Sequence, residues 1–307
     1  MKSVWPILKR ASGPAVMRRL VGWGGLWLNL WLSRMEAWRL QREGTARFKQ
    51  INAAIQRHGQ RVESLVRRSD PQWLSVLVAA HGAARHVAEC LESILSQALP
   101  PELSVEVIVG VDGCPETFQA IGRYLDQASE DRRMRVRVLN FARNYGPYVM
   151  QNSLLYASRG AHVHVVGADD VLVPNAILRI WEFLKECRAC TSAYVLRPMG
   201  FLCDERLERI PGREAHQLKG ALIFSKTALD TLGGFAPWLC AADADFLRRA
   251  EARSIPVYSL PAATYLYRQH GTQMTRGLKT GMRSAIRTRY WRLTQKRLEA
   301  NALRETP

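Results

Sequence analysis

The chain has 307 residues, enough for one large α/β domain with extensions or for two small domains. Its six cysteines are too sparse for a disulfide-stapled secreted protein and favour a reducing cytosol. Its net charge of +17 lies at the two ends: residues 1–70 carry 14 Lys and Arg against 4 Asp and Glu, residues 276–307 carry 9 against 2, and residues 71–275 carry 21 of each. A nucleic-acid-binding protein would carry its charge on the folded body, so no nucleic-acid partner is expected.

Residues 1–70 predict a basic, Trp-rich helical extension. Trp23, Trp27 and Trp31 share one face of a helix, and Lys and Arg surround them, a pattern that favours anionic lipid headgroups. The uncharged run 20–32 is shorter than the roughly 20 residues that a membrane span needs. We therefore expect a peripheral protein on an anionic membrane surface, at the inner face of the cell membrane; docking of this helix on the chain's own body or on a partner is the alternative.

Strands and helices are expected to alternate through the first half of the body. Apolar runs bounded by turn residues predict strands, and 3.6-residue periodicity predicts the helices between them. The expected strands are 73–80, 105–111, 135–140 and 162–166, and the expected helices are 84–97, 116–128 and one from about 147 to 158. This order predicts a parallel sheet with right-handed crossovers.

The second half of the body is less regular. The expected helices are 175–187 and 246–252, the expected strands are 192–198, 218–224 and 257–260, and a basic C-terminal helix is expected within 276–307. The three predicted parts of the chain are therefore residues 1–70, 71–275 and 276–307.

Two adjacent carboxylates, Asp169 and Asp170, follow the buried strand 162–166 directly. Acidic side chains at the carboxyl end of a parallel strand are typical of sites for hard cations and phosphates, although an Asp-rich turn with a helix N-cap is the simpler alternative. His162 and His164 alternate along this strand and are expected to pack. Two nearby strand ends, at 79–82 and at Asp112, are polar too. The chain has neither a P-loop nor a G-x-G-x-x-G motif, which argues against a dinucleotide cofactor.

Six short stretches, in order and with compatible spacing, resemble the motifs of the family 2 glycosyltransferases. They are LSVLVAAHG…CLESILSQ, EVIVGVDGCPET, ARNYGPYVMQNSLLYASRG, GADDVLVP, GGF followed by ADADFLRR, and YRQHGTQMT. The resemblance covers residues 73–275 and implies the α/β GT-A fold, with a Rossmann-like, mixed but mainly parallel sheet, here with a helical N-terminal and a basic helical C-terminal extension. Gly167 stands where many relatives have the first acid of the metal motif.

The resemblance also implies roles for individual residues. Asp170 is expected to bind Mg²⁺ or Mn²⁺ directly, with His270 as a second ligand, because a hard divalent cation offsets the charge of a sugar diphosphate. Asp243 is expected to be the catalytic base, with Asp245 as the alternative; both can instead lead into a helix N-terminus. The expected contacts of the nucleotide-sugar are Ala79, His81, Asp112, Arg143, Asn144, Asp169, Arg249 and Arg268.

The function implied by the resemblance is an inverting, metal-dependent glycosyltransferase. Its donor would be a nucleotide-sugar, UDP-linked, and its acceptor a saccharide or lipid-linked saccharide in the synthesis of a surface polysaccharide, a capsule or a glycolipid. The alternatives are a catalytically inactive scaffold with the same fold and, from the charge alone, a nucleic-acid-binding protein.

Overall fold

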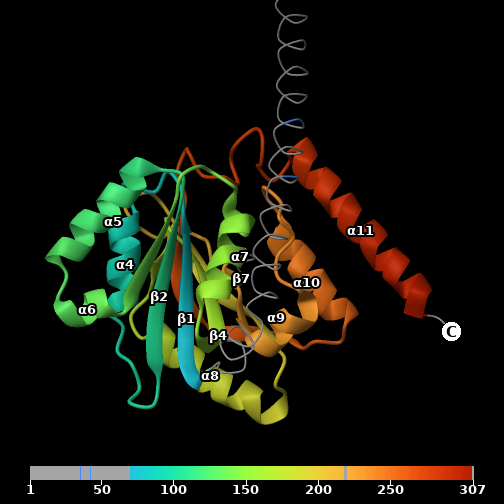
Figure 1. Ribbon diagram of the computed structural model, residues 1–307, viewed down its shortest axis with the longest axis horizontal. Coiled ribbons are helices and arrows are strands. Elements are labelled where there is room, and N and C mark those ends of the chain that lie inside the picture. Colours follow the sequence, from blue (N-terminus) through green and yellow to red (C-terminus); the bar gives the residue numbers. More distant parts are fainter. Residues whose placement is uncertain (1–34, 36–41, 43–69, 218–219, 306–307) are drawn as a thin grey trace, which may run out of the picture.

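The computed structural model describes residues 35, 42, 70–217 and 220–305. A nine-stranded mixed sheet forms the centre of the molecule, with strand order β3-β2-β1-β4-β8-β6-β9-β5 and with β7 paired to β6 (Figure 1). The Trp-rich extension expected within residues 1–70 lies outside the described residues, except at positions 35 and 42.

Four parallel strands make up the first half of the sheet: β1 (Asp70–Ala80), β2 (Ser104–Asp112), β3 (Val136–Phe141) and β4 (Gly160–Gly167). Ala79 pairs with Gly110 of β2 on one side and with Gly167 of β4 on the other. Because parallel strands end at the same edge, this register brings Asp112 and the residues after Gly167 to the carboxyl ends of strands that flank β1.

The second half of the sheet is mixed. It contains β5 (Val171–Leu172), β6 (Val195–Cys203), β7 (His216–Gln217), β8 (Ile223–Ser225) and β9 (Val257–Arg268). β8 runs antiparallel to β4 and to β6, β9 runs parallel to β6, and β5 pairs antiparallel with β9. Leu266 of β9 lies opposite Val171, so the end of β9 runs beside the segment that follows β4.

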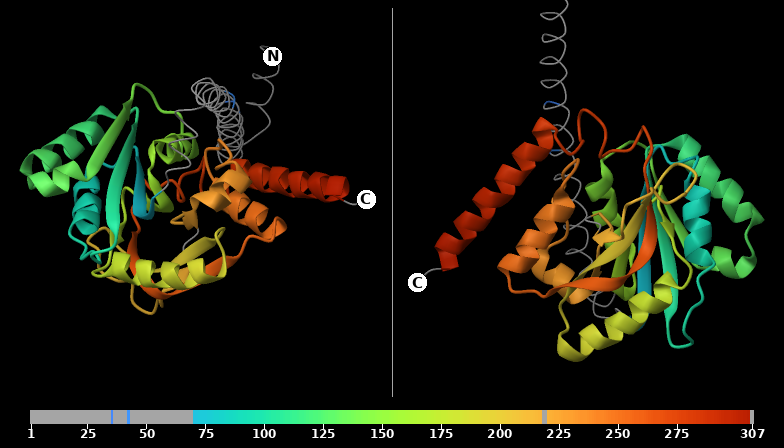
Figure 2. Two further views of the ribbon diagram at one scale, coloured as in Figure 1. Left: turned by 60° about the horizontal axis from the view of Figure 1, so that its bottom comes forward. Right: turned by 180° about the vertical axis from the view of Figure 1, so that it is seen from behind.

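Helices cover both faces of the sheet (Figures 1 and 2). One core lies between the sheet and α4 (Val87–Leu95), α5 (Pro115–Gln127) and α8 (Ala176–Cys190). The other core lies against α7 (Pro147–Ala157), α9 (Lys226–Leu232), α10 (Ala242–Ala252) and α11 (Ala285–Glu305), while the short α6 (Glu130–Met134) is exposed. Alternate residues of β1 serve the two cores, with Val76 facing the first and Leu77 the second.

The C-terminal helix α11 is held by an aromatic stack on the loop before α10 and by a hydrogen bond to α10 itself. The rings of Trp238 and Tyr290 are parallel with centroids 4.5 Å apart, and the Thr294 hydroxyl donates to Asp245 at 2.9 Å. These two contacts place the basic C-terminal segment, which follows the predicted body 71–275, beside α10.

The expected α/β architecture is confirmed, and the strands and helices of the first half lie within a few residues of their predicted bounds. In the second half β9 extends to Arg268 and α10 begins four residues early. Of the segment expected as strand 218–224, positions 218 and 219 lie outside the described residues, and the end of the segment belongs to β8. No helix of the described residues combines the length and apolar character needed to cross a bilayer.

The buried carboxylate of Glu106 ties the amino ends of the parallel strands together. It accepts hydrogen bonds from the Ser75 hydroxyl at 2.6 Å, from the Arg159 amide at 2.5 Å and from the Arg137 guanidinium at 2.7 Å. We expect Glu106→Gln to lower the free energy of unfolding by about 1.5–3 kcal/mol, because a neutral amide replaces a charged acceptor.

Denaturant unfolding measures this change. Ligand binding at the opposite, carboxyl edge of the sheet should be unchanged in the folded variant. An unaltered free energy of unfolding would show that this network does not stabilise the sheet.

Candidate active site

Asp112, the last residue of β2, holds the loop that leads into α7. Its carboxylate oxygens accept the backbone N–H groups of Tyr145 at 2.7 Å and of Gly146 at 2.8 Å, and its carbonyl oxygen lies 2.7 Å from His81 Nδ1. Burial raises the pKa of Asp112 to about 6, although the two amide hydrogen bonds act in the opposite direction. The carboxylate therefore fixes two strand ends and one loop, and its remaining lone pairs can accept a ligand donor.

Position 113 requires glycine because the backbone of residues 143 and 144 lies very close to it. Gly113 has φ +62°, and a Cβ at this position would lie 2.3 Å from both the carbonyl carbon of Arg143 and the amide nitrogen of Asn144. Arg143 and Asn144 are exposed here; Arg143 Nε donates to the Tyr145 hydroxyl at 2.9 Å, and Asn144 Oδ1 accepts from the Gly146 amide at 2.8 Å. The loop is thus built around Asp112.

Asp169 and Asp170 lie where β4 ends, and their carboxylates converge over Gly167. A Cβ on Gly167 would lie 2.6 Å from Asp170 Oδ2 and 2.9 Å from Asp169 Oδ1. Asp170 is 4% exposed and accepts the Arg268 amide N–H at 3.0 Å. Burial, and then the charge of Asp169, raise the pKa of Asp170 well above its ordinary value. Two carboxylates so close favour a cation between or beside them.

The exposed member of the pair is Asp169, with 28% of its side chain accessible. Its Oδ2 lies 2.9 Å from His270 Nε2, and His270 Nδ1 lies 3.0 Å from the Thr272 hydroxyl. The imidazole of His86, at the start of α4, approaches His270 with ring centroids 5.2 Å apart. Burial, followed by the positive charges of Arg268 and His270, lowers the pKa of His86.

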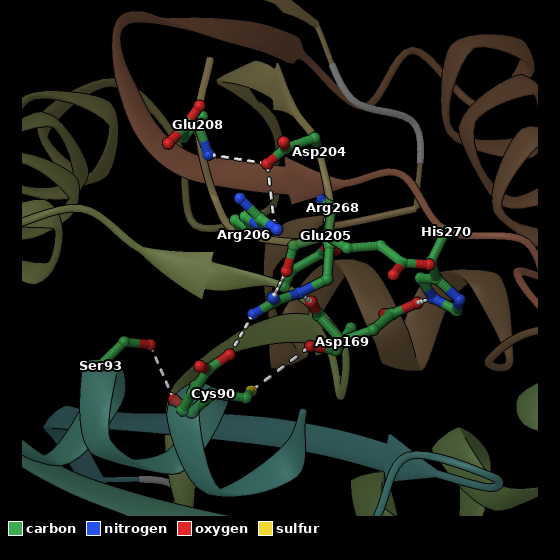
Figure 3. A network of polar contacts seen from close by, with 12 residues as sticks. Cys90, Ser93, Asp169, Asp204, Glu205, Arg206, Glu208, Arg268 and His270 are labelled. Carbon is green, nitrogen blue, oxygen red and sulfur yellow. Dashed lines mark hydrogen bonds and ion pairs between the residues drawn. The ribbon is translucent and has the colours of Figure 1, made fainter. Parts of the chain in front are cut away.

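Arg268 holds the end of β9 against the end of β4 (Figure 3). Its Nε donates to the Asp169 carbonyl at 2.8 Å, and its other two guanidinium nitrogens donate to the Glu205 carbonyl and the Glu89 carboxylate. The side chain is only 2% exposed. Arg268 was expected to contact phosphate; the structure instead directs its guanidinium to protein acceptors and makes it the support of the acidic pair.

Asp169 and His270 are the side chains here that fit a divalent metal ion. Carboxylate oxygen and imidazole nitrogen are both ligands of Mn²⁺, and Mg²⁺ needs only one or two protein carboxylates when phosphates and water complete its shell. In the described ranges no cluster of three or more His, Cys, Asp and Glu side chains is arranged for a metal. A metal here would therefore need ligands from a bound diphosphate.

Asp243 lies in the first turn of α10 and is 8% exposed. Its Oδ1 accepts the Tyr148 hydroxyl at 2.8 Å. Burial raises the pKa of Asp243, and hydrogen bonds from Tyr148 and the Ala244 amide oppose the rise. A buried carboxylate with a raised pKa and a single side-chain donor is suited to accept a proton.

Asp245 has a different environment. One oxygen accepts Arg249 Nε at 2.8 Å and the other accepts the Thr294 hydroxyl at 2.9 Å, and the residue is 1% exposed. Arg249 also donates to the Leu232 and Gly234 carbonyls. Asp245 and Arg249 form a buried structural ion pair that joins α10 to α11 and to the loop after α9, so the predicted phosphate contact of Arg249 finds no support in its geometry.

Tyr265 of β9 connects the two acidic regions. Burial raises its pKa well above the ordinary value, and the charges of Asp170, Asp169 and Asp243 act in the same direction. All three carboxylates are thus close enough to influence one buried phenol. Carboxylates of the predicted metal site and the predicted base thus both act on the pKa of Tyr265.

The remaining predicted residues lie at the same edge or in the core. Ala79 is half-buried near the end of β1, and His81 follows it in an exposed turn against Asp112. His162 and His164 pack as expected: both are buried, and His162 contacts the Tyr194 hydroxyl.

Sequence reasoning missed four residues that shape the site: Glu89, His86, Tyr148 and Tyr265. Tyr148 follows a proline at the start of α7 and lies 95 positions from its partner Asp243. No pattern in the sequence connects residues so far apart.

Comparison with known proteins identifies the family. The family described as "Glycosyl transferase family 2" matches residues 75–231. The succinoglycan biosynthesis protein ExoU of Rhizobium meliloti (strain 1021) is 26% identical over 121 residues, which cover 38% of this chain and 33% of the relative. The poly(ribitol-phosphate) beta-glucosyltransferase of Bacillus spizizenii is 25% identical over 113 residues, 37% of this chain and 17% of the relative. The chain thus matches a third or less of these relatives' length.

Solved structures show the same fold. TarS 1-349 of S. aureus in complex with UDP-GlcNAc superimposes with a TM-score of 0.53 at 19% identity, over 65% of this chain and 59% of that one. The mannosyltransferase PcManGT of Pyrobaculum calidifontis, in complex with GDP-Man and Mn²⁺, gives a TM-score of 0.52 at 14% identity, over 88% of this chain and 76% of that one. The mixed, mostly parallel sheet expected for the GT-A fold is confirmed.

Gly113 offers a test of the loop held by Asp112. We expect Gly113→Ala to lower the free energy of unfolding by about 1–3 kcal/mol and to weaken UDP binding, because the new Cβ meets backbone atoms at a positive φ. Thermal unfolding and titration calorimetry measure the two effects.

Gly122, inside α5, is the matched control because a Cβ there meets nothing within 4 Å. Gly122→Ala should leave UDP binding unchanged and stabilise the chain by about 0.5–1 kcal/mol. Equal behaviour of the two variants would contradict the role given to the loop.

Proposed function

We propose, because this chain belongs to glycosyl transferase family 2, that it moves a sugar from a UDP-sugar to a hydroxyl group of a saccharide or lipid-linked acceptor, with inversion at the transferred carbon. One observation carries the proposal: Asp112 and the pair Asp169–Asp170 lie at the ends of strands that flank β1, and a further buried carboxylate, Asp243, accepts the Tyr148 hydroxyl. This arrangement provides a nucleotide end, a diphosphate end and a base.

The uridine would lie at Asp112. Its carboxylate keeps lone pairs for an imide N–H after accepting the two loop amides, and His81 and Ala79 line the same strand ends. Arg143 and Asn144 are exposed at the start of α7, within reach of a nucleotide held there. The UDP-sugar complex of TarS supports a uridine donor, while the GDP-Man complex of PcManGT shows that this fold also accepts guanosine.

The diphosphate and a divalent ion would lie at Asp169 and His270. Since Asp170 is buried and accepts the Arg268 amide, we reverse the sequence-based roles: Asp169 is the direct ligand with His270, and Asp170 positions it and adds negative charge behind it. A bound Mg²⁺ or Mn²⁺ would offset the charge of the departing diphosphate. Arg268 supports this pair through the Asp169 carbonyl.

Asp243 would act as the general base. In the transfer the acceptor oxygen bonds to the sugar carbon C1, the bond from C1 to the diphosphate oxygen breaks with its electron pair on the nucleotide, and the acceptor proton passes to the Asp243 carboxylate. Tyr148 donates to Oδ1 and so orients the carboxylate. Such a positioned base contributes roughly 10²–10⁴ to the rate.

The acceptor would belong to the synthesis of a cell-surface polysaccharide or glycolipid, in line with the names of the relatives. A lipid-linked acceptor suits an enzyme that acts at the cytoplasmic face of the cell membrane. The basic, Trp-rich segment within residues 1–70 has the composition to attach to anionic lipid there.

A donor panel tests the proposed function. We expect the purified chain to release UDP from at least one UDP-sugar in the presence of Mn²⁺ or Mg²⁺, and release should stop with a chelator. Asp169→Asn should weaken ion-dependent UDP binding while Glu106→Gln, at the other edge of the sheet, should not. A chain that binds and cleaves no nucleotide-sugar under any of these conditions would be an inactive scaffold.

Replacement by Asn is expected to affect different properties at the two positions: catalysis at Asp243 and stability at Asp245. Asp243→Asn should lower kcat by roughly 10²–10⁴ with the fold retained, because it removes the base. Asp245→Asn should lower the free energy of unfolding by about 3 kcal/mol or more, because Arg249 loses its buried partner. Single-turnover kinetics and chemical unfolding measure both, and an active Asp243→Asn variant would contradict the assignment.

Tyr148→Phe tests the base through pH. The Tyr148 hydrogen bond lowers the pKa of Asp243, so its removal should raise that pKa further. Because a general base works in its deprotonated form, the acid limb of kcat/KM should move to higher pH. A profile that loses height without moving along the pH axis would argue that Asp243 does not titrate in the reaction.

A further inference from the structure

The segment between β9 and α11, here called loop 271–284, exposes large apolar side chains. Leu278 is 83% exposed, Met282 65% and Met274 38%. Three cationic side chains, Arg276, Lys279 and Arg283, are exposed among them. From position 252 to position 298 the sequence contains no Asp or Glu. Large apolar side chains exposed beside exposed cations are unusual on a surface that faces only water.

The loop has its own defined structure. The Met282 amide donates to the Thr275 carbonyl at 3.1 Å, the Thr280 hydroxyl donates to the Met274 carbonyl at 2.8 Å, and the Gly281 amide donates to the Gly277 carbonyl at 2.7 Å. The guanidinium of Arg287, from the first turn of α11, donates to the Thr280 carbonyl at 3.1 and 3.3 Å. The exposed side chains therefore belong to a loop that is already folded, so binding through them needs little further loss of conformational entropy.

The same loop adjoins the candidate active site. Gln273 Nε2 donates to the Arg268 carbonyl at 2.7 Å, and the Tyr267 hydroxyl lies 3.4 Å from the Thr275 hydroxyl. Figures 1 and 2 show the red loop at the end of the molecule toward which β1 and β2 run. Whatever binds the loop is brought next to Asp169 and His270.

We propose that loop 271–284 is a membrane-contact site that inserts Leu278 and Met282 among the headgroups of an anionic lipid bilayer. Apolar side chains gain free energy at the headgroup boundary, and each adjacent Lys or Arg adds attraction to anionic lipid. A second copy of the chain is a poorer occupant, because two such loops would bring the exposed cations Arg276, Lys279 and Arg283 of one copy against those of the other.

The role of this membrane-contact site rests on the proposed function. A lipid-linked acceptor would meet the active site at the depth of its headgroup. Bound to lipid, the loop would orient the carboxyl edge of the sheet toward the bilayer.

Depth-sensitive labelling of the full chain tests the site. Cys190 is exposed and the other five cysteines are buried, so a Cys190→Ser background accepts a single label at Leu278→Cys. The matched control is Met134→Cys on α6, an equally exposed apolar position (79%) flanked by Arg132, Arg133 and Arg135 but remote from the loop. An environment-sensitive fluorophore is read with vesicles of phosphatidylcholine, with or without phosphatidylglycerol, and with brominated lipid as quencher.

We expect the label at position 278 to shift to shorter wavelength and to be quenched on vesicles with phosphatidylglycerol, and the label at position 134 to do neither. Leu278→Ser/Met282→Ser should lower vesicle partition about tenfold, and Met134→Ser should leave it unchanged. A label at 278 that stays in water while the chain sediments with vesicles overturns the proposal. So does a chain that does not sediment with them, or a label at 278 buried by dimerisation.

UDP binding in the absence of vesicles separates this proposal from the proposed function. Leu278→Ser/Met282→Ser should bind UDP and Mn²⁺ as the unaltered chain does, since neither side chain touches the site. If the unaltered chain bound no nucleotide yet its loop entered the bilayer, the proposed function would fail and the membrane-contact site would stand.

Discussion

The contact between the end of β9 and the end of β4 determines the rest of the site. Arg268 makes it by donating its amide to Asp170 and its Nε to the Asp169 carbonyl, with its remaining nitrogens on Glu89 and Glu205. The guanidinium is buried and each of its nitrogens donates to a protein acceptor, so it is rigid, and its removal would take this donor from the Asp169 and Glu205 carbonyls. It fixes the two carboxylates at a strand end and brings His270, two residues further on, to Asp169.

The groups that surround each buried carboxylate of the site determine which chemistry it favours. Asp170 and Asp243 are both buried carboxylates with raised pKa values, and the charges of both raise the pKa of Tyr265. At Asp170 a neighbouring carboxylate adds repulsion, which favours a cation; at Asp243 the neighbour is a phenol, which favours a proton acceptor. The proposed ion-binding and basic roles thus rest on what stands beside each carboxylate. The loop after β9 then connects this site to a surface of apolar and positive side chains.

The sequence predicts the parallel half of the fold because its strands are buried on both faces and its helices are amphipathic, so each has a local signal. Asp112 and Asp169 were found because they end such strands. The mixed half has weaker signals: β5 and β7 have two residues each, and β9 continues through Pro261 to Arg268. Which of two adjacent carboxylates faces outward depends on the contact with β9, so the sequence alone did not show that Asp170 is buried and Asp169 is more exposed. The contacts of Arg268 could not be predicted, because Glu89 lies 179 positions away in the chain and its other acceptors are backbone carbonyls. Asp245 lies only four residues before Arg249, but the sequence alone did not distinguish this ion pair from a catalytic role.

The central claim is that Asp169, placed by Arg268 and paired with His270, binds a divalent ion together with the diphosphate of a nucleotide. Crystals of the chain grown with UDP and Mn²⁺ test it directly through anomalous scattering at the manganese absorption edge. We predict one strong anomalous peak within coordination distance of the Asp169 carboxylate and the UDP phosphates. Bound UDP with no manganese peak beside Asp169, or with the peak at another group of side chains, would contradict it.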